Sequence, residues 1–147
     1  MSITIREYHP VSGALLGNMS IMDFGKLTAG THGRVKVIDI AFDEVTNVGN
    51  LKIGLISTGG ITPFSGGTGH FGIISSASFD STLASQAIAP PNYFLGVNTT
   101  NTASDVNNVA IPMRTSTISN YIYLDIEIGS TNLAAGNGSF KLFYDWN

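Results

Sequence analysis

The chain has 147 residues, which fits one domain spanning residues 1–147, and it contains no cysteine, so disulfides, thiolate metal ligands and cysteine nucleophiles are excluded. Charged residues make up only 12% of it and the formal net charge is −3, so there is no basic face for nucleic acid or for an anionic membrane surface. No stretch approaches the roughly 20 apolar residues of a membrane-spanning helix, and the N-terminus lacks the basic start and apolar run of a secretory signal.

Apolar and polar residues alternate over most of the chain, which predicts strands rather than helices. In the first expected strand, Ile3 and Ile5 share one face and Arg6 lies on the other. Pro112 marks its strand as an edge strand or a bulge, because proline cannot donate a ladder hydrogen bond. The expected strands cover residues 3–8, 34–42, 51–57, 71–75, 93–97, 109–114, 120–129 and 139–147.

The last two of these strands are expected to form a terminal hairpin. In the first arm, alternation places isoleucines and a leucine on one face and Tyr121, Tyr123 and Asp125 on the other, as in a half-buried antiparallel strand. Asn137-Gly138 gives a turn signal before the return strand. The face that carries the tyrosines is therefore expected to be the outer one.

Only one segment, residues 79–89, predicts a helix, because Asp80 or Ser81 can cap it and Pro90-Pro91 would end it. Elsewhere, short strands separated by Gly, Asn, Ser and Thr indicate an all-β protein. We therefore expect an antiparallel β-sandwich, either jelly-roll or immunoglobulin-like, with at most one short helix.

The stretch GGTGHFG contains, at Gly67, Gly69 and Gly72, the G-x-G-x-x-G spacing of a dinucleotide-binding loop. Such a loop works between a strand and a helix whose N-terminus faces the pyrophosphate. Here a predicted strand follows instead, and no G-K-[ST] completes a phosphate loop, so we expect no nucleotide and no other cofactor. The stretch is interpreted as part of a long inter-strand loop. The candidate contact residues in and beside it are Phe64, His70 and Phe71.

The sequence offers no assembled set of catalytic or metal-ligating residues. The three histidines stand alone, without a carboxylate or second histidine at metal-ligand spacing, whereas a structural zinc site needs about four ligands. Asp125 and Glu127 share one strand face at a separation that a glycosidase could use, yet solvated strand faces have this spacing routinely. We therefore expect neither a bound metal nor an enzymatic activity.

The final expected strand is rich in aromatic residues. Alternation places one set on a single face: Phe140, Leu142, Tyr144 and Trp146. Aromatic side chains dominate both protein cores and interfaces. The favoured interpretation packs this face in the sandwich core, and the alternative packs it against a neighbouring subunit.

Residues 22–56 resemble the opening of bacterial immunoglobulin-like β-sandwich domains. Phe24-Gly25 and Gly30 match a pattern of the form xFGxxxxG. An alternating strand at residues 34–42 and the polar turn TNVGN follow, as in those domains. The resemblance covers about a quarter of the chain and implies a β-sandwich, although the later loops are longer than such domains normally carry.

The whole chain also resembles small virion proteins of tailed phages, such as capsid decoration (cement) proteins and neck or tail accessory proteins. The shared features are a plain methionine start, no cysteine, few charges, loops rich in Gly, Ser, Thr and Asn, and dense short strands. The resemblance implies a non-enzymatic structural protein of the virion that contacts other virion proteins and forms homo-oligomers, with trimers favoured. The interface candidates are Phe64, His70, Phe71, Tyr93, Phe94, Tyr144 and Trp146.

A carbohydrate- or receptor-binding β-sandwich module is the alternative function. Sugars stack on exposed aromatic rings beside polar groups, so Tyr121, Tyr123 and Asp125 would form the platform. This hypothesis requires all three side chains to be accessible. A hydrolase ranks last, because no nucleophile, base or metal set is apparent.

Overall fold

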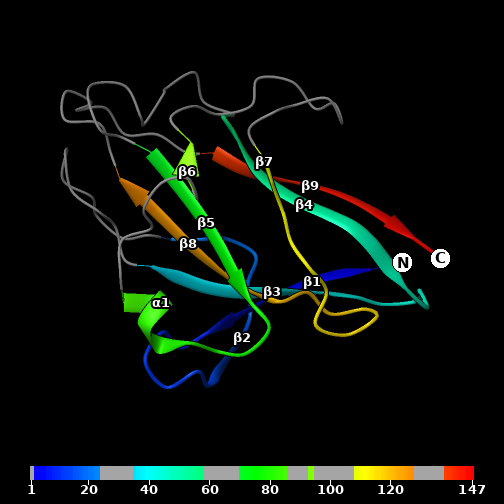
Figure 1. Cartoon of the computed structure of the whole chain (residues 1–147), viewed down its shortest axis with the longest axis horizontal. Coiled ribbons are helices and arrows are strands. Elements are labelled where there is room, and N and C mark those ends of the chain that lie inside the picture. The colour runs from blue at the N-terminus through cyan, green and yellow to red at the C-terminus, as the bar shows by residue number, and fades with distance from the viewer. Residues whose placement is uncertain (1, 24–34, 58–69, 86–92, 95–107, 128–137) are drawn as a thin grey trace.

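The structure is a computed structural model that describes residues 2–23, 35–57, 70–85, 93–94, 108–127 and 138–147. Over these residues the chain is an antiparallel β-sandwich with one short helix, which confirms the fold class expected from the alternation (Figure 1). The elements are β1 (Ile3–Tyr8), β2 (Leu15–Asn18), β3 (Lys36–Phe42), β4 (Val48–Ser57), β5 (His70–Ser76), α1 (Ser81–Ser85), β6 (Tyr93–Phe94), β7 (Asn108–Ala110), β8 (Tyr121–Glu127) and β9 (Gly138–Trp146).

Two sheets make the sandwich. One has six strands in the order β2-β1-β3-β8-β5-β6, and the other has three in the order β7-β4-β9. The order β1-β3-β8-β5 in one sheet and β4-β9 in the other is that of strands A-B-E-D and C-F in an immunoglobulin-like sandwich. Of the two topologies that the sequence left open, the strand order therefore matches the immunoglobulin-like one.

The prediction that the last two strands form a terminal hairpin is wrong. β8 pairs with β3 and β5 in the larger sheet, whereas β9 pairs with β4 in the smaller one. Both edges of β8 are thus occupied, and β9 crosses to the other sheet. There its Leu142 and Tyr144 pack against the core, as the face assignment of that strand predicted.

Other elements differ from the sequence-based expectations in length. β7 ends at Ala110, two residues before Pro112, so the proline lies beyond the strand that it was expected to weaken. α1 lies within the segment expected to be helical, and residues 86–89 of that segment lie outside the described residues. β2 was not predicted, because Leu15-Leu16-Gly17-Asn18 neither alternates nor contains a β-branched residue.

The main core fills the space between the two sheets. It takes side chains from β3, β4, β5 and β8 and one from the residue after β7: Ile38, Ile40, Phe42, Val48, Leu51, Ile53, Phe71, Ile73, Ile111, Ile122 and Leu124. Both ends of the chain are tied to the connection between β3 and β4. Asn147 exchanges backbone hydrogen bonds with Thr46 and Asn47, and Asp43 N–H donates to the carbonyl of Ser2.

The opposite face of the larger sheet is also covered. Tyr8, Val35, Val37, Ala84 of α1 and Tyr123 form a second buried cluster there. β3 and β8 are therefore buried on both faces, which is unusual for antiparallel strands. The face expected to be the outer one is largely withdrawn from solvent for this reason.

Candidate functional site

A buried carboxylate on β3 anchors a polar cluster on the face of the larger sheet that points away from the main core. We call this face the second face. Ile38 and Ile40 point into the main core, so the strand period places Asp39 on the other side, where its side chain has no exposed surface. Arg6 of β1 lies directly opposite Asp39 in the strand register. A buried charge is tolerated only where partners satisfy it, and the register supplies the first of them.

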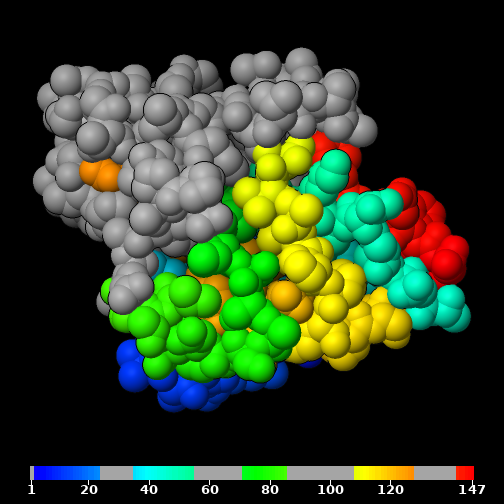
Figure 2. All heavy atoms as spheres, in the orientation of Figure 1, coloured from blue at the N-terminus to red at the C-terminus, as the bar shows by residue number. Residues whose placement is uncertain are grey.

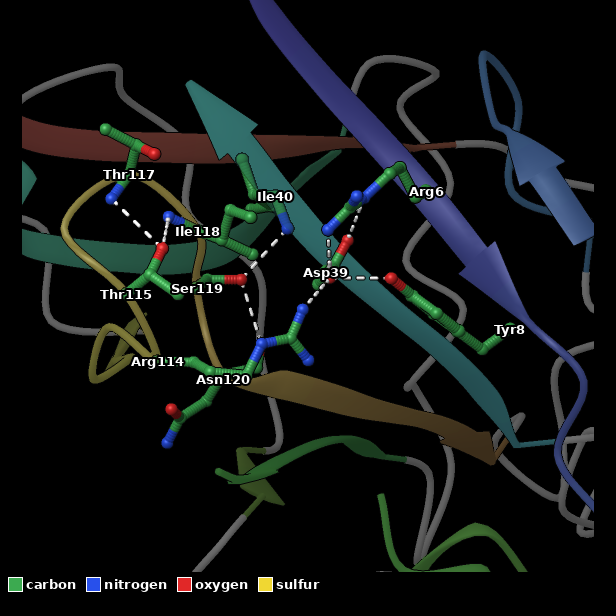
Figure 3. Close-up of polar contacts among 10 residues, drawn as sticks. All are labelled: Arg6, Tyr8, Asp39, Ile40, Arg114, Thr115, Thr117, Ile118, Ser119 and Asn120. Carbon is green, nitrogen blue, oxygen red and sulfur yellow. Dashed lines mark hydrogen bonds and ion pairs between the residues drawn. The ribbon is translucent and has the colours of Figure 1, made fainter. Parts of the chain in front are cut away.

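Three side chains converge on this carboxylate (Figure 3). Arg6 Nε donates to Asp39 Oδ1 at 2.8 Å and Arg6 Nη2 to Oδ2 at 2.6 Å, which is a bidentate pair. The Tyr8 hydroxyl donates to Oδ2 at 2.8 Å and Arg114 Nη2 to the same oxygen at 2.6 Å. We call Arg6, Tyr8, Asp39 and Arg114 the Asp39 cluster.

Arg114 reaches the cluster from the irregular segment between β7 and β8. Ser119 fixes that segment to β3, since its N–H donates to the Ile40 carbonyl at 2.9 Å and its Oγ accepts from Ile40 N–H at 2.9 Å. The guanidinium carbon of Arg114 lies 4.1 Å from the centroid of the Tyr121 ring. Arg114 Nη1 is buried without a hydrogen-bond partner, and this cation–π contact compensates part of that cost.

The surroundings of the cluster raise the pKa of three of its side chains, Arg6, Tyr8 and Arg114. Burial and the hydrogen bond to Asp39 raise the pKa of the Tyr8 phenol, and the hydrogen bond to Asp39 raises the pKa of Arg6. Burial alone would lower the pKa of Arg114, but the nearby oxygens of Tyr8 and Asp39 raise it overall. Two guanidinium groups and a phenol engage both carboxylate oxygens, so the cluster acts as a cross-link of β1, β3 and the segment before β8.

The prediction that Tyr121, Tyr123 and Asp125 form an accessible glycan platform is wrong. Tyr123 and Asp125 have no exposed surface, and Tyr121 is half-buried. The Tyr123 hydroxyl lies 3.0 Å from Ser76 Oγ and accepts a hydrogen bond from Asp80 N–H at 2.8 Å, which anchors the connection between β5 and α1. Alternation assigned these residues to the correct face, but it could not reveal what covers that face.

The ring of Tyr121 contacts several other side chains on the second face. The rings of Tyr8 and Tyr121 meet edge to face at a centroid distance of 5.0 Å, and Phe79 contacts the same ring at 6.1 Å. Arg114 completes its surroundings. Tyr121 is therefore a packing residue, and Arg114 covers one face of its ring.

The interface candidates fall into three groups. Phe71 is 1% exposed and belongs to the main core, so it is not an interface residue. Phe64 lies outside the described residues, and for His70, Tyr93 and Phe94 the structure describes the backbone of β5 and β6 only. Tyr144 and Trp146 remain, both on β9.

The two residues of β9 differ in exposure. Tyr144 is half-buried and its ring lies 5.0 Å from that of Phe42. Trp146 is 57% exposed, and its ring lies 5.7 Å from that of Tyr144, centroid to centroid. The interpretation that this face packs in the sandwich core therefore holds for Tyr144. Trp146 retains a large exposed surface that is available to another molecule.

A second exposed apolar region lies around β2 and was missed by the sequence analysis. Its residues are Val11, Leu15, Leu16 and Ile21, and we call them the hairpin patch. They are between 56% and 81% exposed, although leucine, isoleucine and valine are the residues most often buried. The signal in the sequence is the pair of adjacent leucines, which cannot both face one side of a sheet.

The two exposed regions lie at different ends of the molecule. In Figure 1, β2 is at the bottom and the C-terminal end of β9 is at the right. Figure 2 shows the same separation on the molecular surface, with the N-terminal residues in blue along the lower margin and the C-terminal ones in red at the right. Leu15 and Leu16 lie on β2 and Trp146 lies on β9, and each of these strands is at the edge of its sheet.

Motifs for other chemistry have no counterpart in the described part of the chain. Gly72 of the glycine-rich stretch lies inside β5, so the stretch leads into a strand and not into a helix N-terminus. No group of three or more His, Asp or Glu residues is placed to hold a metal ion among the residues described. Within the same residues, no helix has the length and apolar character needed to cross a membrane.

Comparisons of the chain with protein-family models, with curated proteins and with solved structures give no match.

Proposed function

We propose that this chain is a non-enzymatic structural protein of a virus particle, of the capsid decoration or accessory type, that acts by binding copies of itself and other virion proteins. The single observation that carries the proposal is the exposure of large apolar side chains on edge strands of both sheets. Leu15 and Leu16 lie on β2, and Trp146 lies on β9. The resemblance in composition to small phage virion proteins supplies the biological setting.

Edge strands with exposed apolar side chains favour association with other chains. Such a strand presents unpaired backbone donors and acceptors as well as hydrophobic surface, and monomeric proteins usually protect it with charged residues. β2 contains no charged residue, whereas β9 contains Lys141 and Asp145, of which Asp145 accepts a hydrogen bond from Asn50 Nδ2 at 2.8 Å. Of the two edge strands, β2 therefore lacks the charged residues that protect an edge from docking.

The Asp39 cluster fits a structural role as well. It is a cross-link whose carboxylate oxygens are both engaged, and it holds β1 against β3 beside the exposed hairpin. A rigid sheet edge loses less conformational freedom when a partner binds. We infer that the cluster keeps the contact surface in one conformation.

Trp146 provides a direct test, because it is the only tryptophan in the chain. If β9 docks on another subunit, raising the protein concentration should shift its emission to shorter wavelength and reduce quenching by acrylamide. Trp146→Phe should weaken the association measured by sedimentation, whereas Lys52→Ser, at an exposed position of β4, should leave it unchanged. Emission that does not change up to the highest concentration would contradict docking at β9.

The virion assignment needs a separate measurement. Peptide mass spectrometry of gradient-purified virus particles from the source culture should detect the chain in a fixed ratio to the major shell protein. A chain that is expressed but absent from the particles would contradict the assignment. Binding of the purified chain to a glycan array would instead favour the alternative of a receptor-binding module, at a surface other than the buried tyrosines.

A further inference from the structure

We propose that two copies of this chain associate around a twofold axis through the outer edge of β2, so that the two six-stranded sheets become continuous. The proposal rests on the self-association part of the proposed function and specifies its surface. β2 pairs with β1 on one side and is the outermost strand of the larger sheet. Its other edge is the one offered to the second copy.

The hairpin patch supplies the surface that such a contact buries. Four of the six large apolar residues that are exposed among the described residues fall in one stretch of the chain, residues 11–21. Covering them on two copies would remove on the order of 1,000 Å² of surface, the lower limit for a specific interface. An interface at this limit predicts a dimer with a dissociation constant in the micromolar range.

A second copy fits this edge better than a charged partner does. Residues 10–22 contain no Asp, Glu, Lys or Arg, so two identical edges approach each other without local charge repulsion although each chain carries −3 overall. A patch without charges also offers no ion pair to an acidic or basic partner. Twofold contacts use the same patch on both subunits, as an uncharged apolar edge permits.

The residues of β2 are complementary to themselves in the antiparallel direction. The register that pairs all four of them places Leu15 opposite Asn18 of the second copy and Leu16 opposite Gly17. A Cβ built on Gly17 would meet nothing within 4 Å, so there is open space beside it for the leucine of the other chain. Each large residue thus meets a small or polar one, and the contact occurs twice.

β2 is short, and this decides what holds the dimer. It has four residues, and its register with β1 shifts between Glu7 and Tyr8. Both features limit the number of ladder hydrogen bonds that a second copy forms, as in natural sheet edges. Burial of the hairpin patch must therefore supply most of the affinity, and changes to Leu16 should be felt more than changes to the backbone.

Sedimentation equilibrium of the full chain tests the dimer. The wild type should reach the mass of a dimer at high concentration, and Leu16→Lys should raise the dissociation constant at least about tenfold, because the twofold axis brings two like charges together. Lys52→Ser, at an exposed position of β4, should leave this dissociation constant unchanged. Leu16 is exposed in the single chain, so Leu16→Lys should retain the circular dichroism spectrum of the wild type.

Cysteine cross-linking tests the direction and register, and the chain has no cysteine of its own to interfere. Leu15→Cys and Asn18→Cys proteins, mixed under mild oxidation, should form a mixed disulfide much faster than either protein alone forms a homodimer. Directly opposed residues in antiparallel strands have the Cα separation that a disulfide requires. Equal rates in all three samples, or faster homodimers, would overturn the proposed pairing.

The outcomes separate this inference from the proposed function. A monomer at every concentration overturns both the dimer and self-association. An oligomer that Leu16→Lys leaves intact, or a trimer of the kind that the phage resemblance implies, overturns the β2 contact and supports self-association through another surface. A dimer that Leu16→Lys disrupts supports the inference even if the chain is absent from virus particles.

Discussion

At the scale of single residues, Asp39 is the position on which the second face depends most. Its carboxylate is fully buried and accepts hydrogen bonds from two arginines and a tyrosine, so removing the charge would leave two guanidinium groups without their counter-ion. Both arginine side chains retain about a fifth of their surface in solvent, which reduces that cost.

We expect Asp39→Asn to lower the free energy of unfolding by about 2–4 kcal/mol, at or below the range for breaking a buried ion pair. Asp43→Asn, an exposed aspartate that accepts a hydrogen bond from Ser2, should change it by less than about 0.5 kcal/mol. Urea unfolding followed by circular dichroism measures both. Equal effects of the two substitutions would mean that the cluster contributes nothing beyond an ordinary surface contact.

Tyr8 gives the same cluster a pH dependence on the alkaline side. The folded chain holds the phenol proton more tightly than the unfolded chain, whose tyrosine ionises near 10.0. This stabilisation is therefore complete below about pH 10 and is lost as the pH rises through the higher pKa of the folded state. The difference in unfolding free energy between wild type and Tyr8→Phe should shrink above pH 10. A Tyr8→Phe difference that stays constant over this pH range would contradict this assignment.

At the scale of elements, the connection between β1 and β2 depends on a close approach to the segment before α1. Gly13 has a φ of +74°, a conformation that residues with a Cβ rarely adopt, and a Cβ there would lie 2.8 Å from Cδ1 of Phe79. His9 organises the same turn, since its Nδ1 accepts from the backbone N–H groups of Val11 and Ser12. Glycine thus lets this turn pack against the ring of Phe79.

Gly13→Ala should destabilise the fold by about 2–3 kcal/mol, because it adds backbone strain and displaces the phenylalanine. Gly49→Ala is the matched control: a Cβ there meets nothing within 4 Å, and the backbone is not in the left-handed region. That change should lie within about 1 kcal/mol of the wild type and should be stabilising in sign. Thermal unfolding of the two variants compares them, and a tolerated alanine at Gly13 would disprove the close approach.

The secondary-structure elements also show which features of the fold could be predicted from the sequence and which could not. Alternation located most strands and assigned Tyr123 and Asp125 to the correct face, because side-chain direction along a strand is a local property. Strand pairing is not local: β9 joins β4, about 90 residues away in the chain, and nothing in the last 30 residues indicates it. The same limit hid the arginines that neutralise Asp39, since Arg6 and Arg114 approach it from distant parts of the chain.

At the scale of the whole molecule, the two sheets depend on each other. The main core takes side chains from both of them, with Ile40 and Leu124 on one side and Leu51 and Ile53 on the other. The hydrogen bonds of Asn147 to the connection between β3 and β4 join the end of the smaller sheet to the larger one. A sandwich with one shared core should unfold as a single cooperative unit.

The aromatic residues allow this cooperativity to be measured, because they report on different sheets. Trp146 fluorescence follows the smaller sheet, and near-ultraviolet circular dichroism is expected to carry signal from the packed tyrosine rings at positions 8 and 121 on the larger one. The two urea transitions should coincide in midpoint and slope at a concentration low enough to keep the chain monomeric. Phe42→Ala, which removes a ring between the sheets, should move both midpoints together by an amount equivalent to about 3–5 kcal/mol. Separate midpoints would mean that the sheets fold independently and that the shared core is not what joins them.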